Sequence, residues 1–129
     1  MRRAGVLNQP LSCALAGLGH TDTLVVCDCG LPRPAGVPVV DLAVVFGVPS
    51  FAQVLDALLG ELVVEGATLA KEAREHNPAV VRLVGDRVGA PRWVSHEQLK
   101  QETGSARLLV RTGEATAYAN VILRCGVPF

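Results

Sequence analysis

Short apolar runs alternate along the chain with segments in which apolar residues recur at helical spacing. The runs are rich in Val and Leu, which is typical of strands buried within a sheet. They predict strands at 23–28, 39–46, 62–64, 92–94, 108–111 and 121–124. For 39–46 the alternative is a buried irregular segment, because Asp41 interrupts the run. The segment at 31–38, LPRPAGVP, predicts a loop, since its prolines and glycine exclude regular structure.

Helical spacing predicts helices at 10–18, 51–58, 67–76 and 96–104. Two of them begin with a Ser-x-x-Gln capping box, formed by Ser50 with Gln53 and by Ser95 with Gln98. Residues 79–91 give weak signals and predict no element. Strands and helices that alternate without a linker predict an α/β fold. We expect a single layered α/β/α domain over 1–129, with a central mixed, largely parallel sheet.

Composition narrows the class of protein further. Apolar residues make up 50% of the chain and aromatic residues 4%, as is common where helices cover both faces of a sheet. Twelve Lys and Arg balance twelve Asp and Glu, so nucleic acid is not an expected partner. The N-terminus lacks the apolar region of a signal peptide, and no stretch approaches the ~18–20 apolar residues of a membrane span. These features predict a soluble, cytoplasmic protein without membrane insertion.

The four cysteines, Cys13, Cys27, Cys29 and Cys125, have neither the density of a disulfide scaffold nor a CxxC spacing. They therefore indicate free thiols in a reducing compartment, and we predict no metal. The GLG sequence at 17–19 does not follow a strand, and Asp22 stands where a dinucleotide fingerprint needs its third glycine. We therefore expect no dinucleotide cofactor site of the Rossmann type.

The tetrapeptide GHTD at 19–22 lies between a predicted helix and a predicted strand, where a loop side chain can face a ligand. His20 is the candidate acid–base group, since an imidazole both donates and accepts protons near neutral pH. The alternative is a loop histidine that caps the carboxyl end of the helix. Asp22 either orients this imidazole or caps the next segment, and the sequence leaves both open.

Three further positions carry groups that suit a hydroxyl-rich ligand. Asp28 ends a buried strand, where ligands bind in open α/β sheets, although a turn aspartate is the alternative. His96 opens a helix whose dipole disfavours a cation, which favours a neutral hydrogen-bonding partner or a solvated residue. Tyr118, Ala119 and Asn120 precede the last strand and offer a phenol and a carboxamide. An ordinary buried tyrosine is the alternative for Tyr118.

Five sequence blocks, in matching order and spacing, resemble the D-ribose pyranase family. They are GHTDTLVVCDCGLP at 19–32, GVPSFAQVL at 47–55, EHNP at 75–78, HEQLKQET at 96–103 and RTGEATAYANVILRCGVPF at 111–129. The resemblance implies a cofactor-free isomerase that interconverts the β-pyranose and β-furanose forms of free D-ribose. It implies that His20 donates the proton. It also implies that Asp28, His96 and the Tyr118–Ala119–Asn120 triplet contact the sugar.

The resemblance further implies a ring-based homo-oligomer of ten subunits, or alternatively of eight. In such a ring the C-terminal segment of one subunit completes a neighbour's pocket. The apolar final strand predicts an edge that a neighbour covers.

Fucose mutarotases are similar but usually have GHGD and an aromatic residue at the position of His96. Thr21, Leu31 and His96 therefore favour ribose. Two departures from the ribose pattern, Cys29 in place of a usual alanine and a shortened 79–92 region, leave the sugar preference open. Mutarotation of another free sugar such as L-fucose, and noncatalytic sugar binding in a transport system, remain alternatives.

Overall fold

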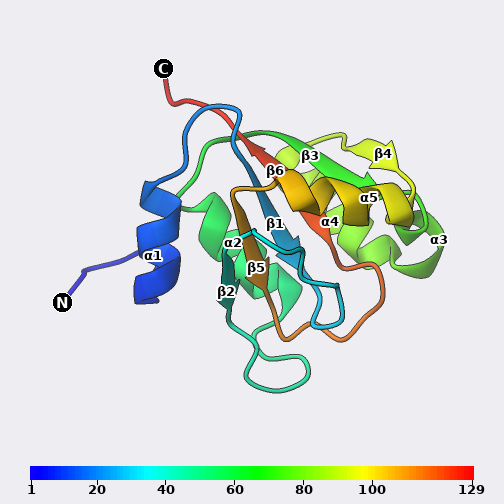
Figure 1. The fold of residues 1–129 in the computed structure, drawn as a ribbon, viewed down its shortest axis with the longest axis horizontal. Helices are drawn as coiled ribbons and strands as arrows, with labels where there is room; N and C mark the ends of the chain where they lie inside the picture. Colours follow the sequence, from blue (N-terminus) through cyan, green and yellow to red (C-terminus); the bar gives the residue numbers. More distant parts are fainter.

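A six-stranded mixed sheet crosses the computed structural model, which describes residues 1–129 (Figure 1). In spatial order the strands are β2, β5, β1, β6, β3 and β4. Their bounds are β1 Thr23–Cys27, β2 Val39–Asp41, β3 Val64–Ala70, β4 Arg92–Val94, β5 Leu108–Arg111 and β6 Val121–Cys125. The β1–β5, β2–β5 and β3–β4 pairs are parallel, whereas β6 runs antiparallel to both β1 and β3. The predicted α/β class and the mixed sheet are confirmed.

Helices cover both faces of this sheet. They are α1 Gln9–Ala16, α2 Phe51–Leu59, α3 Ala73–His76, α4 Pro78–Val88 and α5 His96–Glu102, followed by a 3₁₀ turn at Thr103–Ser105. In Figure 1, α5 lies in front of the sheet, with α2 and α4 behind it. None of the helices is long and apolar enough to cross a membrane.

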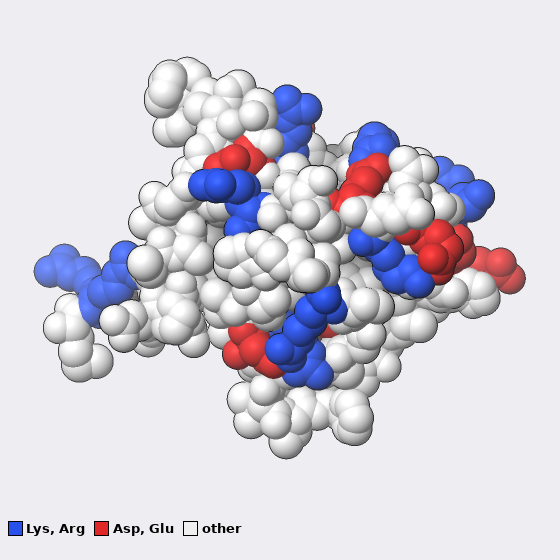
Figure 2. All heavy atoms as spheres, viewed as in Figure 1, with Lys and Arg blue, Asp and Glu red and all other residues white.

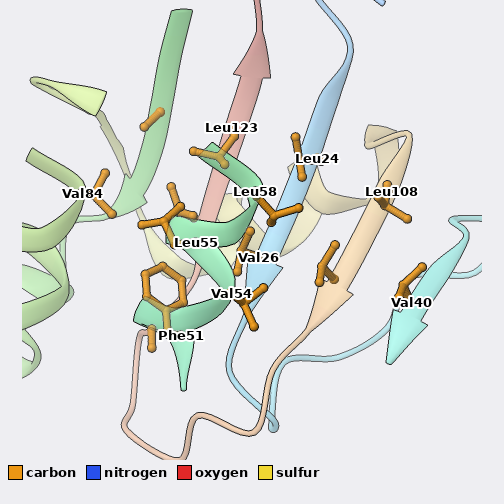
Figure 3. Packing of buried hydrophobic residues seen from close by; sticks show 14 of the residues in the cluster. Leu24, Val26, Val40, Phe51, Val54, Leu55, Leu58, Val84, Leu108 and Leu123 are labelled. Carbon is orange, nitrogen blue, oxygen red and sulfur yellow. The ribbon is translucent and has the colours of Figure 1, made fainter. Parts of the chain in front are cut away.

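Alternation along β1 divides the core between the two faces. Leu24 and Val26 pack with Phe51 and other α2 residues, as Figure 3 shows, whereas Val25 lies on the opposite face in a cluster with Leu99 of α5. The β1 residues among these are fully buried, as expected for a strand paired on both sides. Burial of each such side chain stabilises the fold by about 1.5–3 kcal/mol.

Several local predictions are confirmed by hydrogen bonds. At the start of α2, Ser50 Oγ accepts from the Gln53 N–H at 3.2 Å, and Gln53 Oε1 accepts from the Ser50 N–H at 2.9 Å. At α5 only half of the predicted capping box forms. Ser95 Oγ accepts from the Gln98 N–H at 3.1 Å, but the Gln98 amide donates to Glu102 instead of returning to Ser95.

The region from 62 to 91 differs most from the sequence prediction. The predicted helix at 67–76 is wrong, because β3 continues to Ala70 between β6 and β4 and only α3 at its end is helical. Pairing on both sides overrides the helical spacing of these residues. The segment at 79–91, for which no element was predicted, forms most of α4, with Asn77 as its N-cap and Pro78 as its first residue.

Two further expectations are wrong. The strand predicted at 39–46 ends at Asp41, and the loop that follows is not buried, since Val44, Val45 and Phe46 are 75%, 62% and 84% exposed. The final strand is not an edge, because β6 pairs with β1 on one side and with β3 on the other within the same chain. No apolar edge is therefore left at the C-terminus for a neighbour to cover.

Candidate active site

Asp28 and Asn120 form a reciprocal bridge at the carboxyl end of β1. The Asp28 N–H donates to Asn120 Oδ1 at 2.9 Å, and Asn120 Nδ2 donates to Asp28 Oδ2 at 2.8 Å. The Gly30 N–H donates to Asp28 Oδ1 at 2.9 Å. The antiparallel register pairs Val26 with Val121 and so places the residue after β1 beside the residue before β6. The carboxylate keeps lone pairs free for ligand hydroxyls, because it is only half-buried.

Two imidazoles pack against Tyr118, two residues before Asn120. The His96 ring meets Tyr118 edge-on at a centroid distance of 5.0 Å, and the His76 ring stacks on it at 5.4 Å. Tyr118 has a backbone φ of 61°, which is rare for a residue other than glycine. His96 Nδ1 is buried and has no hydrogen-bond partner, so aromatic packing rather than a hydrogen bond from that nitrogen orients this ring.

Asn77 anchors the loop that precedes Tyr118. Its Nδ2 donates to Thr116 Oγ1 and to the Ala117 carbonyl, both at 2.9 Å, while its Oδ1 accepts from the Val80 N–H at 3.3 Å. From the sequence, Asn77 is expected only as the residue after the helix predicted at 67–76, so its role here was missed. The only signal was an Asn directly before a Pro, which is also a helix start.

A hollow of about 280 Å³ opens beside the Asp28–Asn120 bridge. It is lined by Asp28, Gly30, Leu31, Pro32, His96, Ala117, Tyr118 and Asn120. Four of the predicted site residues therefore meet here, and a fifth, Ala119, is fully buried between Tyr118 and Asn120. The hollow combines a carboxylate, a carboxamide and an imidazole with an aromatic ring, which suits a small polyhydroxyl ligand.

His20 lies at the opposite end of β1 from this hollow. It precedes the strand by three residues, Asp28 follows it, and five strand residues span roughly 16 Å. The His20 side chain is 53% exposed, and its Nε2 lies 3.2 Å from Glu65 Oε2, whose other oxygen pairs with Arg124 at 2.7 Å. Within one chain, His20 and the other predicted site residues are not brought together.

Asp22 shapes the loop that carries His20. Its Oδ2 accepts from the Gly19 N–H at 2.8 Å, which closes the GHTD turn, and no hydrogen bond links it to the imidazole. Thr21 has a φ of 68°, and its N–H donates to the Cys125 carbonyl at 2.9 Å. The end of β6 therefore fixes the GHTD loop, just as the start of β6 fixes Asp28.

Charged groups brace the segment next to Asp28. The Arg111 guanidinium donates to the Cys29 carbonyl at 2.9 and 3.1 Å and pairs with Asp41 at 3.0 Å. Burial alone would raise the pKa of Asp41. Hydrogen bonds donated by the Ala43 N–H and by Arg111 outweigh this effect and lower the pKa below its ordinary value. Burial, reinforced by the charge of Asp28, raises the pKa of Cys27 to about 12, which makes this thiol an unreactive core group.

Elsewhere, charges of both signs are interspersed on the surface, and the face in Figure 2 carries no large patch of one sign. No three His, Cys, Asp or Glu side chains converge in a way that could hold a metal ion. The prediction that the site uses no cofactor stays a prediction, and chelation of the purified protein tests it.

Comparison with known proteins decides the family. A family model described as the RbsD/FucU transport protein family matches residues 1–128. The chain belongs to the RbsD/FucU family. Among curated RbsD/FucU relatives, it is 59% identical to a D-ribose pyranase of Streptomyces avermitilis over 129 residues, with 100% of both chains covered. It is 56% identical over 129 residues to D-ribose pyranase 1 of Rubrobacter xylanophilus, again with 100% of both covered.

Solved structures of the RbsD/FucU family share the fold. The structure of Bacillus subtilis RbsD complexed with D-ribose matches with a TM-score of 0.95 and 39% identity over 100% of both chains. A fucose mutarotase from Streptococcus pneumoniae in complex with L-fucose matches with a TM-score of 0.80 over 95% of both chains. Its 20% identity supports a common fold alone. The resemblance found in the sequence blocks is confirmed at the level of the family.

Proposed function

We propose that the chain is a D-ribose pyranase, an isomerase that interconverts the β-pyranose and β-furanose forms of free D-ribose. One observation carries this proposal: the hollow that joins Asp28, His96, Tyr118 and Asn120 lies in a fold that superposes on a D-ribose complex with a TM-score of 0.95. Full-length identity to curated D-ribose pyranases supports the same reaction. A hollow of about 280 Å³ suits a monosaccharide, since larger drug-sized ligands occupy ~300–1,000 Å³.

The reaction needs acids, bases and positioning, and we propose no cofactor or metal. A proton from His20 goes to the ring oxygen, while the anomeric hydroxyl loses its proton to a base or water. The bond between the anomeric carbon and the ring oxygen then breaks to give the aldehyde. A different hydroxyl attacks the same carbon and gives up its proton to His20, while the aldehyde oxygen takes a proton back from the base or water, so that both groups are restored. Acid–base catalysis of this kind contributes roughly 10²–10⁴-fold.

The residues of the hollow hold the sugar during this exchange. The Asp28 carboxylate accepts hydrogen bonds from ring hydroxyls, and the Asn120 amide keeps that carboxylate in place. His96 offers a hydrogen-bonding nitrogen, and the Tyr118 ring offers an apolar face and a hydroxyl. Ala119 is fully buried between Tyr118 and Asn120, so it anchors the backbone that carries these two side chains. Holding the open chain in this way favours reclosure on the second hydroxyl.

His20 has to come from a neighbouring copy in this proposal, because the five residues of β1, which span roughly 16 Å, separate it from Asp28. The family resemblance implied that the C-terminal segment is the element shared between subunits. The geometry favours the GHTD loop instead, since Asn120 already bonds to Asp28 of its own chain. The site is thus complete only in a homo-oligomer, for which we propose a ring-based assembly.

The loop at 43–48, uncharged and protruding at the bottom of Figures 1 and 2, offers a contact for such a neighbour. Val44, Val45, Phe46 and Val48 are each more than half exposed there. The loop is held in shape, because the Gly47 N–H donates to the Gly113 carbonyl and a Cβ at Gly113 would lie 2.3 Å from the Val48 oxygen. Phe46 also lines a second hollow together with Asp28, which makes the loop continuous with the candidate site.

Saturation-transfer NMR on D-ribose tests the reaction directly. Exchange between pyranose and furanose signals that depends on the protein supports a pyranase. Exchange only between α and β anomers, or faster anomer exchange on L-fucose, would instead indicate a mutarotase. Ribose binding without any exchange would indicate a noncatalytic sugar-binding accessory of transport.

We also propose that the protein acts in the cytoplasm, because all four of its cysteines are free thiols, as is usual in a reducing compartment.

Subunit mixing tests the shared pocket. Inactive His20→Ala and Asn120→Ala chains, mixed 1:1 under conditions that let oligomers exchange subunits, should regain activity in about one quarter of the pockets. Those pockets receive an intact His20 from one chain and an intact Asn120 from the other. Native mass spectrometry shows whether the chains have mixed. Mixed oligomers without recovered exchange would mean that each pocket is built from one chain.

A further inference from the structure

Tyr118 packs against two histidine rings in a backbone conformation that it would rarely adopt alone. Its φ of 61° lies in the left-handed region, where a side chain is crowded by its own backbone. Such a conformation persists only where the surroundings fix it. The surroundings here are the His96 ring at 5.0 Å, nearly perpendicular at 85°, and the His76 ring at 5.4 Å, stacked within 29°.

His76 differs from His96 in its place relative to the hollow. His96 and Tyr118 line the hollow, whereas His76 does not. A ring that stacks on Tyr118 without reaching the hollow acts on a ligand only through Tyr118. His76 ends α3, and the next residue, Asn77, hydrogen-bonds to Thr116 and Ala117 just before Tyr118. The joint between α3 and α4 therefore holds the loop at three successive positions.

We propose that His76 is a positioning residue of the sugar site, which stacks on Tyr118 and sets the direction of its phenol. The inference rests on the proposed binding of D-ribose in the hollow. His76 performs no proton transfer in this arrangement, because it does not line the hollow and stacks on Tyr118 behind it. Stacking on Tyr118 requires a flat ring at position 76. An aromatic residue there should therefore keep Tyr118 in place, whereas a small or flexible side chain should not.

The test compares His76→Ala, His76→Phe and His76→Gln in the full-length protein. An aromatic stack of this kind corresponds to about a two- to tenfold change in an equilibrium constant. His76→Ala and His76→Gln should therefore raise the KM for D-ribose about two- to tenfold, with kcat within about twofold of the unmodified protein. His76→Phe should restore the KM. A fall in kcat at saturating ribose, unmatched by a rise in KM, would overturn the positioning role.

A second readout is independent of turnover. Tyr118 is the only tyrosine in the chain, so ring-labelled tyrosine gives a single set of aromatic NMR signals. His76→Ala should shift these signals because a stacked ring is lost, and His76→Phe should return them toward their original positions. The same signals follow a titration with D-ribose. If the unmodified protein showed no sugar exchange, the proposed reaction would fail while this titration would still decide the role of His76.

Arg74→Ala provides a matched control on the same short helix. Arg74 lies 4.0 Å over the Trp93 ring, and its loss perturbs α3 without touching Tyr118. This variant should leave the tyrosine signals and the KM unchanged. Equal effects of Arg74→Ala and His76→Ala, or failure of His76→Phe to restore either readout, would mean that His76 only stabilises α3 and would overturn the proposal.

Discussion

Asn120→Asp is the sharpest perturbation of the candidate site, because it changes one atom type in a buried bridge. Asn120 is 1% exposed, and its Nδ2 donates to Asp28 Oδ2 at 2.8 Å. The substitution keeps the oxygen that accepts from the Asp28 N–H. It replaces the donor with a second carboxylate oxygen that faces the first. The expected result is a bridge that repels itself at neutral pH.

The size of the effect follows from two contributions. A hydrogen bond to a charged group is worth about 1.5–3 kcal/mol, and this contribution is lost. Two unit charges about 4 Å apart repel by about 4 kcal/mol at an effective dielectric constant near 20, which solvent reduces here because Asp28 is half-buried. We expect the free energy of unfolding to fall by about 2–3 kcal/mol at pH 7.5. Ribose exchange should fall more than about tenfold, since the hydroxyl acceptor moves.

Denaturant unfolding and saturation-transfer NMR, each repeated from pH 7.5 to pH 4.5, measure both effects. The repelled carboxyl pair binds a proton more readily in the folded than in the unfolded protein. The stability deficit should therefore shrink as pH falls, because a protonated carboxyl again donates to Asp28.

Asn8→Asp is the matched control for this substitution. Asn8 Oδ1 caps α1 by accepting from the Leu11 N–H at 2.9 Å, and Asp performs that role equally well. A deficit at pH 7.5 no larger for Asn120→Asp than for Asn8→Asp would refute the assigned role of the bridge.

Three other outcomes are expected. His20→Ala should abolish pyranose–furanose exchange while light scattering shows an intact oligomer, and exchange near the normal rate would remove His20 from the mechanism. Activity should survive exhaustive chelation, whereas a loss that zinc or manganese restores would contradict a cofactor-free reaction. Intact-mass analysis after alkylation at pH 8 should show modified Cys13, which is exposed, but not Cys27, whose pKa burial raises to about 12.

Sequence patterns predicted helices and strands correctly where the residues of a single segment are sufficient to determine its secondary structure. The Ser50 capping box and the apolar run at Thr23–Cys27 appear in the structure as expected. The errors fall where distant segments decide the outcome. Residues 67–70 form part of β3 because β6 and β4 pair with them, and neither pairing can be inferred from local spacing. For the same reason β6 was predicted as an edge strand, although it pairs with β1 and β3 inside the sheet.

The candidate site divides in a similar way. Asp28 could be singled out because it ends a buried strand, and the structure places it at the hollow. Asn77 and His76 could not be assigned in this way, since their importance comes from contacts with residues about 40 positions later in the chain. His20 was identified as a functional group, and the strand predicted at 23–28 already separates it from Asp28, whereas the contacts that tie the GHTD loop to the end of β6 appear only in the folded chain.

The two ends of one strand pair support the proposal that a neighbouring subunit supplies His20. β1 and β6 run antiparallel, so one end of the pair joins Asp28 to Asn120, and the other ties Thr21, next to His20, to Cys125. Each end is fixed by hydrogen bonds, and the paired strands between them are buried. No hinge within the chain can close roughly 16 Å of strand. In the proposed closed ring, every subunit would present its GHTD loop to a neighbour, so that every hollow would receive a histidine.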